Sequence, residues 1–209
     1  YTGAGVAAGD INNDGLMDLY FSGNMVTGRL FLNRGGLQFE DITASAGLEN
    51  QQWGTGCSII DINNDGWADL FISGENSSGQ AVCILYINNE GTSFTNAGAG
   101  IDGHMMGELA ISDFDLDGDI DLAINGINNS QSPSTKIYVN TDGNFSQMGA
   151  GIMGLSNSTI AWGDYNNDTW PDLLISGTDA NSDPNTKIYT NNAGSSFSAL
   201  TGSFNGIEN

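Results

Sequence analysis

Short apolar runs alternate with polar turns along the whole chain, and none of the runs keeps a helical period. The runs are rich in β-branched and aromatic residues and are bounded by Gly, Asn or Asp, a pattern that is typical of β-strands. Examples are "DLYFSG", "DLFISG" and "DLLISG". The pattern predicts an all-β fold made of many short strands.

The pattern of runs repeats four times. An acidic string begins at Asp10, Asp61, Asp113 and Asp164, at intervals of 51, 52 and 51 residues. A small apolar run precedes each string, and three further runs follow it, the last centred on a Phe. A period near 50 indicates a solenoid or a propeller. We expect four antiparallel strands in each unit, and units at residues 1–50, 51–101, 102–153 and 154–209 of one domain.

Four strands in a radially repeated unit are typical of a β-propeller. A single sheet leaves one face uncovered, whereas sheets stacked around an axis cover each other. We therefore expect the repeated aromatic residues of the third strands to lie between blades: Phe31, Tyr86, Tyr138 and Tyr189. Three arrangements stay open at this point: a closed four-bladed ring, a part of a larger propeller, and an open unit that pairs with other chains.

The acidic string has a fixed order of oxygen-bearing side chains. In "DINNDGLMDL", positions 1, 3, 5 and 9 carry carboxylates or an amide, and position 7 can offer its backbone carbonyl. Hard oxygen ligands without His or Cys favour Ca²⁺, because Mg²⁺ prefers to keep its water. The predicted ligands of up to four calcium ions are Asp10, Asn12, Asp14, Leu16 and Asp18; Asp61, Asn63, Asp65, Trp67 and Asp69; Asp113, Asp115, Asp117, Asp119 and Asp121; and Asp164, Asn166, Asp168, Trp170 and Asp172.

The string is not an EF-hand loop, although it begins like one. An EF-hand needs a bidentate Glu at position 12 and flanking helices. Position 12 is apolar in every copy and lies in a predicted strand, and we expect the Asp at position 9 to supply the closing ligand instead. Three copies have Gly at position 6, where a sharp turn is required, but the fourth has Thr169. A β-branched residue at positive φ is strained, so we expect the fourth site to be the weakest.

The pattern D-x-[DN]-x-D-G-x-x-D-L, four times in phase between two strands, resembles the FG-GAP/VCBS repeats of integrin-α-like β-propellers. The resemblance covers essentially the whole chain. It implies one propeller blade per repeat and a Ca²⁺ ion in the loop between the first and second strands. It also implies an extracellular or cell-surface setting, often in adhesion or polysaccharide-related proteins. Propellers of this family usually have about seven blades, whereas this chain has four repeats.

The charge, the apolar runs and the cysteines of the chain each exclude one kind of partner or structure. The chain has 25 acidic residues against 4 Lys and Arg, with a net charge of -21, which argues against nucleic acid and anionic membranes as partners. No stretch approaches the roughly 20 apolar residues of a membrane span. Cys57 and Cys83 fall on the first and third strands of one unit, too far apart for a disulfide, so we expect both thiols to be free.

No catalytic constellation is visible, and we predict a binding protein rather than an enzyme. The only histidine, His104, has no nucleophile motif beside it, and we expect it in the connection that enters the third unit. Three polar loops, beginning near residues 74, 126 and 177, lie opposite the calcium loops and could hold a protein or carbohydrate ligand. Asn76 and Asn128 in these loops are candidate glycosylation sites.

The sequence therefore predicts an extracellular, calcium-binding β-propeller module for adhesion, recognition or assembly, in which Ca²⁺ is structural. Two alternatives stay open. One is a self-assembling structural protein that forms homo-oligomers or fibres. The other is a scaffold or accessory domain of an enzyme that acts on polysaccharides.

Overall fold

The computed structural model describes residues 5–23, 26–49 and 54–200, and within these residues every regular element is a β-strand. The chain divides into two compact units, Tyr1–Gly103 and His104–Asn209, each of which holds two antiparallel sheets. This confirms the all-β fold. The unit boundaries expected at residues 1, 50, 51 and 209 lie outside the described residues. No helix that could cross a membrane occurs in the described part of the chain.

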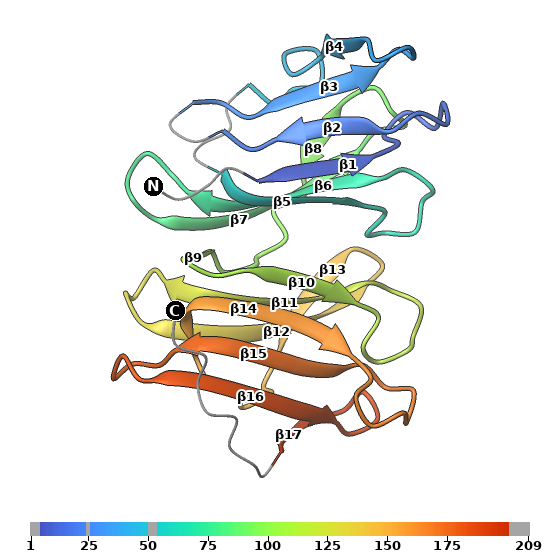
Figure 1. Cartoon of the computed structure of the whole chain (residues 1–209). Helices are drawn as coiled ribbons and strands as arrows, with labels where there is room; N and C mark the ends of the chain where they lie inside the picture. The colour runs from blue at the N-terminus through green and yellow to red at the C-terminus, as the bar shows by residue number, and fades with distance from the viewer. Residues whose placement is uncertain (1–4, 24–25, 50–53, 201–209) are drawn as a thin grey trace. The chain divides into compact units, whose positions relative to one another are not determined.

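The first unit contains two four-stranded sheets whose strands follow chain order, so that each strand pairs with the next (Figure 1). The first sheet consists of β1 (Val6–Gly9), β2 (Asp18–Phe21), β3 (Arg29–Asn33) and β4 (Phe39–Asp41). The second consists of β5 (Gly54–Ile60), β6 (Asp69–Glu75), β7 (Ala81–Asn88) and β8 (Phe94–Asn96).

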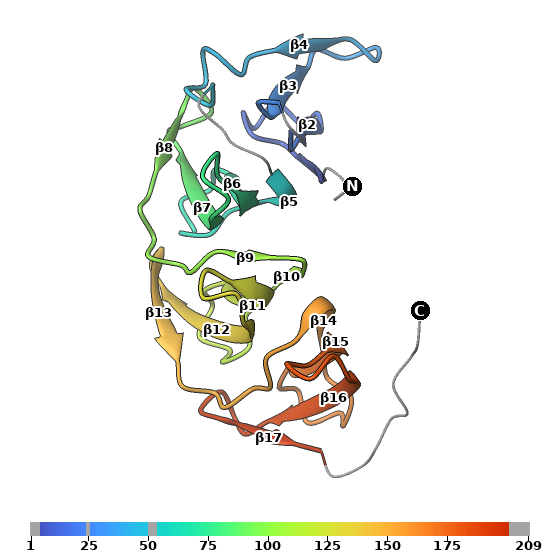
Figure 2. The same ribbon diagram turned by 90° about the vertical axis from the view of Figure 1, so that its left-hand side faces the viewer.

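The second unit repeats this plan with one addition (Figure 2). The third sheet consists of β9 (His104–Met105), β10 (Leu109–Ser112), β11 (Asp121–Asn128), β12 (Pro133–Thr141) and β13 (Asn144–Met148). The fourth consists of β14 (Ser156–Gly163), β15 (Asp172–Thr178), β16 (Pro184–Asn191) and β17 (Phe197–Ala199).

The third sheet has five strands rather than the expected four, because β9 also pairs with β11. His104 lies opposite Asn128 and Met105 opposite Ile127. Glycine allows the backbone after β9 to come this close to β11: a Cβ on Gly107 would lie 2.2 Å from the carbonyl oxygen of Asn125. His104, expected in a connecting segment, is thus a buried strand residue.

Alternation along the strands builds the core of the first unit. Tyr20, Leu30 and Leu32 of the first sheet pack with Leu70 and Ile72 of the second, and all five are almost fully buried. Tyr86 packs against the same core, as the sequence predicted. Phe31 does not: it lies half-buried on the opposite face of its sheet, edge-to-face with Phe21 at a centroid distance of 5.9 Å. No sheet formed by the described residues of this unit covers that face.

The core of the second unit is built in the same way and is richer in aromatic side chains. Tyr189 belongs to it, as predicted, together with Leu173 and Ile175. Phe114 and Trp162 stack with ring centroids 5.5 Å apart and an interplanar angle of 4°. The stack joins the loop after β10 to the strand β14, and so connects the two sheets beside the acidic loops.

The two thiols are free, as predicted. Cys57 lies in β5 and Cys83 in β7, and β6 runs between them, pairing Ile72 with Cys57 and Ser73 with Cys83. Burial raises the pKa of Cys57 to about 11, so this thiol stays protonated at neutral pH.

Candidate metal centre

Each acidic string forms the loop between the first and second strands of its sheet, if the third sheet is counted from β10, and the four loops share one backbone path. Position 4 has positive φ in every copy, at 56° for Asn13 and Asn64 and 59° for Leu116 and Asn167. Position 6 follows with φ between 80° and 100°. The carboxylate at position 1 holds this turn, because it accepts the backbone N–H groups of positions 5 and 6.

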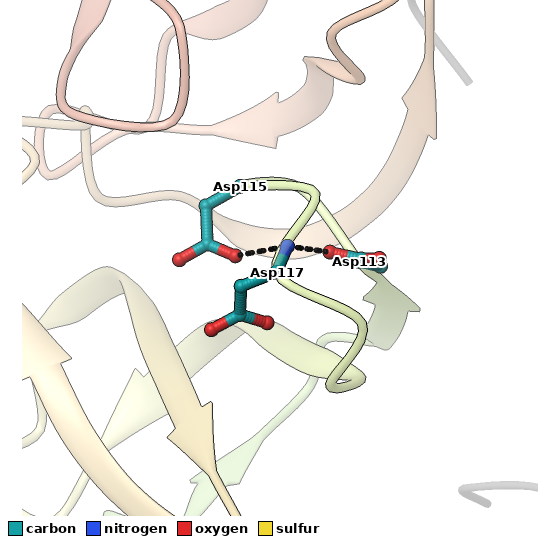
Figure 3. Close-up of side chains that lie close together, drawn as sticks. All are labelled: Asp113, Asp115 and Asp117. Atoms are coloured by element: carbon teal, nitrogen blue, oxygen red, sulfur yellow. Dashed lines mark hydrogen bonds between the residues drawn. The ribbon is translucent and has the colours of Figure 1, made fainter.

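The third loop shows how the turn gathers oxygen atoms. Carboxylate oxygens of Asp113, Asp115 and Asp117 lie within 4.8 Å of one another (Figure 3). The N–H of Asp117 donates to Asp113 Oδ1 at 3.1 Å and to Asp115 Oδ1 at 3.4 Å. Carboxylates held this close repel each other. Desolvation, followed by the charge of Asp117, raises the pKa of Asp115.

The carboxylate at position 9 closes each loop from inside the protein. Asp18, Asp69, Asp121 and Asp172 are at most 2% exposed. In every copy one oxygen accepts the N–H of position 2, and the other accepts the N–H of an Asn at the end of the third strand. A carboxylate oxygen has two lone pairs, so these bonds leave one on each oxygen for a cation.

Burial raises the pKa values of three position-9 carboxylates, those of Asp18, Asp69 and Asp121, despite these hydrogen bonds. Desolvation raises the pKa of Asp69 to about 6 and that of Asp121 to about 7, and raises that of Asp18 as well. Neighbouring carboxylates of the same loop add to the effect. A bound cation would favour the charged form of these groups and offset both the burial and the repulsion.

The donor set fits a hard divalent cation. Positions 1, 3, 5 and 9 offer only carboxylate and amide oxygens, and the turn brings three of them into one small volume in the third loop. Such donors suit Ca²⁺ rather than a softer metal. The N–H of position 7 donates to the position-5 carboxylate in every loop. The carbonyl oxygen of position 7 is the further ligand that the sequence predicts. The ligand list itself stays a prediction.

The two tryptophans at position 7 pack against the turn between the third and fourth strands of their own sheet. A Cβ on Gly91 would lie 2.9 Å from Trp67 Cζ3, and one on Gly194 would lie 3.0 Å from Trp170 Cζ3. Both indole rings are half-buried. Their position shields the loops, and they are only partly available for stacking on a ligand.

Sequence reasoning missed four asparagines that organise the loops: Asn33, Asn88, Asn140 and Asn191. Each is the last residue of a third strand, or for Asn140 the second-last, and its side chain joins the next turn to the carbonyl of loop position 8. Asn88 also donates to the carbonyl of Ile11, and Asn191 to that of Phe114, in the preceding loop of the same unit. The signal was present, because Asn recurs at this position in "LFLN", "LYIN", "IYVN" and "IYTN".

The fourth loop keeps the geometry of the others despite its substitution. Thr169 has φ 80°, close to the 83° of Gly15, and its N–H donates to Asp164 Oδ2 at 2.9 Å. The strain predicted for a β-branched residue is therefore present rather than relieved by a different turn. The lower calcium affinity of this loop stays a prediction.

The predicted recognition loops are shorter than the sequence suggested, because the strands on both sides extend into them. The loop between β6 and β7 is a tight turn in which Asn76 Oδ1 accepts the N–H groups of Ser78 and Gln80. Asn128 and Asp179 hold the corresponding turns in the third and fourth sheets by the same bonds. Glycosylation of Asn76 and Asn128 stays a prediction.

Comparison with known proteins agrees with this repeat plan. A family model described as FG-GAP-like repeat matches residues 10–72, 61–124 and 113–175. The chain belongs to the FG-GAP-like repeat family. Each match to this family runs from one acidic loop to the second strand of the following sheet, so the FG-GAP-like repeats coincide with the loops described above.

Two further comparisons give little beyond the family. No curated protein matches the chain. Among solved structures, the chain is similar to the V. cholerae biofilm matrix protein Bap1, with 13% identity and a TM-score of 0.38. The match covers 92% of this chain and 38% of that structure.

Proposed function

We propose that this chain is an extracellular calcium-binding β-propeller module, in which Ca²⁺ holds the loop between the first and second strands of each blade. Its role is binding or assembly rather than catalysis. The observation that carries the proposal is the loop itself: four copies of one backbone path gather carboxylate and amide oxygens, and in the third copy three carboxylates lie within 4.8 Å of one another.

The physical argument is that such a loop has few ways to relieve its own repulsion. It holds no cationic side chain at any of its positions. The net charge of -21 adds a general repulsion that bound divalent cations would reduce. An extracellular setting fits this, because calcium is abundant outside cells and the family is often found there.

Calcium titration tests the proposal. We expect isothermal titration of the chelator-treated chain to show up to four ions per chain, with the fourth loop weakest. Asp65→Ala should remove about one ion, because Asp65 is a predicted ligand. The variant should stay folded, because this residue is exposed in the loop and supplies no core contact. Glu49→Gln, at an exposed acid outside the loops, is the matched control. A chain that takes up no calcium, or an unchanged stoichiometry in Asp65→Ala, would contradict the proposal.

A further inference from the structure

The two faces of each sheet are used in a fixed order along the chain. In the first sheet, we call the face that carries Ala7, Tyr20 and Leu30 the trailing face. The leading face is the opposite one, which carries Val6, Ala8, Leu19, Phe21 and Phe31. The faces of the other sheets are named by the equivalent repeat positions. In the first unit, the trailing face of the first sheet packs on the leading face of the second, through Tyr20 and Leu30 against Leu70 and Ile72.

The second unit repeats this order. Ala123 and Ile137, on the trailing face of the third sheet, share a core with Leu173 and Ile175, on the leading face of the fourth. All four residues are fully buried, so the contact is as complete as in the first unit. Two independent pairs of sheets therefore show that a trailing face fits a leading face.

Among the described residues of its unit, the leading face of the first sheet lacks such a partner. Val6 is 61% exposed and Phe21 is 44% exposed, whereas Ile72, at the position of Phe21, is 3% exposed. Ala8 is exposed on the same face. The five residues that define the face are apolar, and Arg29 and Asp41, which lie opposite Phe21 and Phe31 on it, form an ion pair.

The trailing face of the fourth sheet is equally open in the part of its unit that the structure describes. Leu174 is 41% exposed, whereas Tyr20, at the same repeat position, is 1% exposed. Ala161, Leu174, Ile188 and Tyr165 line a pocket of about 250 Å³ on this face. Gly163 shows the same openness: no atom of the described residues lies within 4 Å of its Cβ position, whereas a Cβ on the equivalent Gly9 would lie 2.3 Å from Ile59 Cγ2 of the next sheet.

The two open faces also complement each other in side-chain volume. The first unit combines Ile11 with Ile59 in its core, and the corresponding residues of the open faces are the larger Tyr165 and the smaller Ala8. It likewise combines Tyr20 with Ile72, and the corresponding residues are the smaller Leu174 and the larger Phe21. Each exchange pairs a gain in volume with a loss, as well-tolerated core substitutions do.

We propose that the trailing face of the fourth sheet binds the leading face of the first sheet in a second copy of this chain. The contact is heterologous, so it closes a cyclic dimer or continues into a longer assembly. The proposal does not depend on calcium binding. It names a partner for the assembly role, and calcium titration of the monomeric variants described below tests the metal sites separately.

Sedimentation velocity over a range of concentrations tests this junction in calcium-containing buffer. We expect the unmodified chain to form a dimer or a larger assembly. Phe21→Glu, on the leading face, and Leu174→Glu, on the trailing face, should each weaken association by more than about tenfold, because either places a charge in an apolar contact. Leu37→Glu, in the exposed turn between β3 and β4, is the control and should associate like the unmodified chain.

Mixing the two variants gives the sharpest test. Phe21→Glu keeps an intact trailing face and Leu174→Glu an intact leading face, so the mixture should form a one-to-one dimer that does not grow further. Thermal melting of each variant in calcium confirms that it is folded. A chain that stays monomeric at all concentrations would overturn the proposal. Such a result is expected if the two faces bind each other within one molecule. Association that both glutamate variants leave intact would overturn it as well, because another surface would then be responsible.

Discussion

The side-chain amide of Asn88 donates a hydrogen bond to the backbone carbonyl of Ile11 at 2.8 Å, across 77 residues of chain. The same amide donates to Ala68 at 2.9 Å, so one side chain ties the acidic loop of the first sheet to that of the second. Asn191 repeats the arrangement with Phe114 and Pro171 in the other unit. In each unit, one asparagine side chain therefore links the two acidic loops through hydrogen bonds.

Asn88→Ala should lower the free energy of unfolding by about 1–3 kcal/mol, because it leaves buried carbonyl groups without a donor. Asn33→Ala is the matched control: Asn33 holds the equivalent turn, but among the described residues its amide donates only to the carbonyl of Met17, at an exposed position. We expect a smaller loss there. Urea denaturation of both variants measures the difference, and equal losses would show that the bond between loops contributes nothing.

Asp65→Asn and Asp69→Asn should separate a metal ligand from a structural carboxylate. Asp69 is buried and accepts the N–H groups of Ile62 and Asn88, so an amide there would place a donor against a donor and destabilise the fold with or without calcium. Asp65 lies in the exposed loop, and an Asn can keep its bond to the N–H of Trp67. We expect Asp65→Asn to lower the melting temperature in calcium but not in excess EGTA.

Melting curves of both variants in calcium and in EGTA test whether each carboxylate acts as a metal ligand or as a structural group. If Asp65→Asn lowered the melting temperature equally in the two conditions, its carboxylate would not act through a metal. If Asp69→Asn had no effect in EGTA, its two backbone bonds would not stabilise the fold.

Thr169→Gly should stabilise the chain by relieving about 1–3 kcal/mol of backbone strain, because Thr169 adopts φ 80° where the other loops have glycine. Gly66→Thr is the reciprocal change and should cost a similar amount. The larger chain freedom of glycine in the unfolded state subtracts up to about 1 kcal/mol from the gain. Chemical denaturation in calcium tests the pair, and a loss of stability in Thr169→Gly would show that the loop tolerates threonine without strain.

Asp41 should make a small contribution to stability that disappears in acid. The Thr43 hydroxyl and backbone N–H donate to Asp41 Oδ1, and with a smaller contribution from Arg29 they lower the pKa of Asp41 below its ordinary value. A lowered folded-state pKa means that the stabilisation is present above the unfolded pKa and is lost as pH falls through the folded one.

We therefore expect the stability difference between the unmodified chain and Asp41→Asn to shrink as the pH falls from 5 toward roughly 2. The effect is modest because Asp41 is exposed. Urea denaturation across this range, with Glu49→Gln as the control, measures it. A difference that stays constant with pH would show that the carboxylate charge plays no part.

The sequence alone determined the repeat, the strands and the acidic loops. These features are local: alternation of apolar and polar residues defines a strand, and Asp, Asn and Gly at fixed spacing define a turn, so each can be recognised within about ten residues. The family followed from the same local pattern, and the match over residues 10–175 confirmed it. Even the Thr169 anomaly could be predicted, because backbone strain depends on one residue and its φ angle.

Only the tertiary structure decided which groups meet across long distances in the chain. The contact of Asn88 with Ile11 depends on how one sheet lies on the next, and no local pattern encodes it. The pairing of β9 with β11 depends on a close backbone approach at Gly107 and Gly126. The exposure of Phe21 and Leu174 was equally hidden, because their sequence positions match those of buried residues, and burial depends on whether another sheet covers the face.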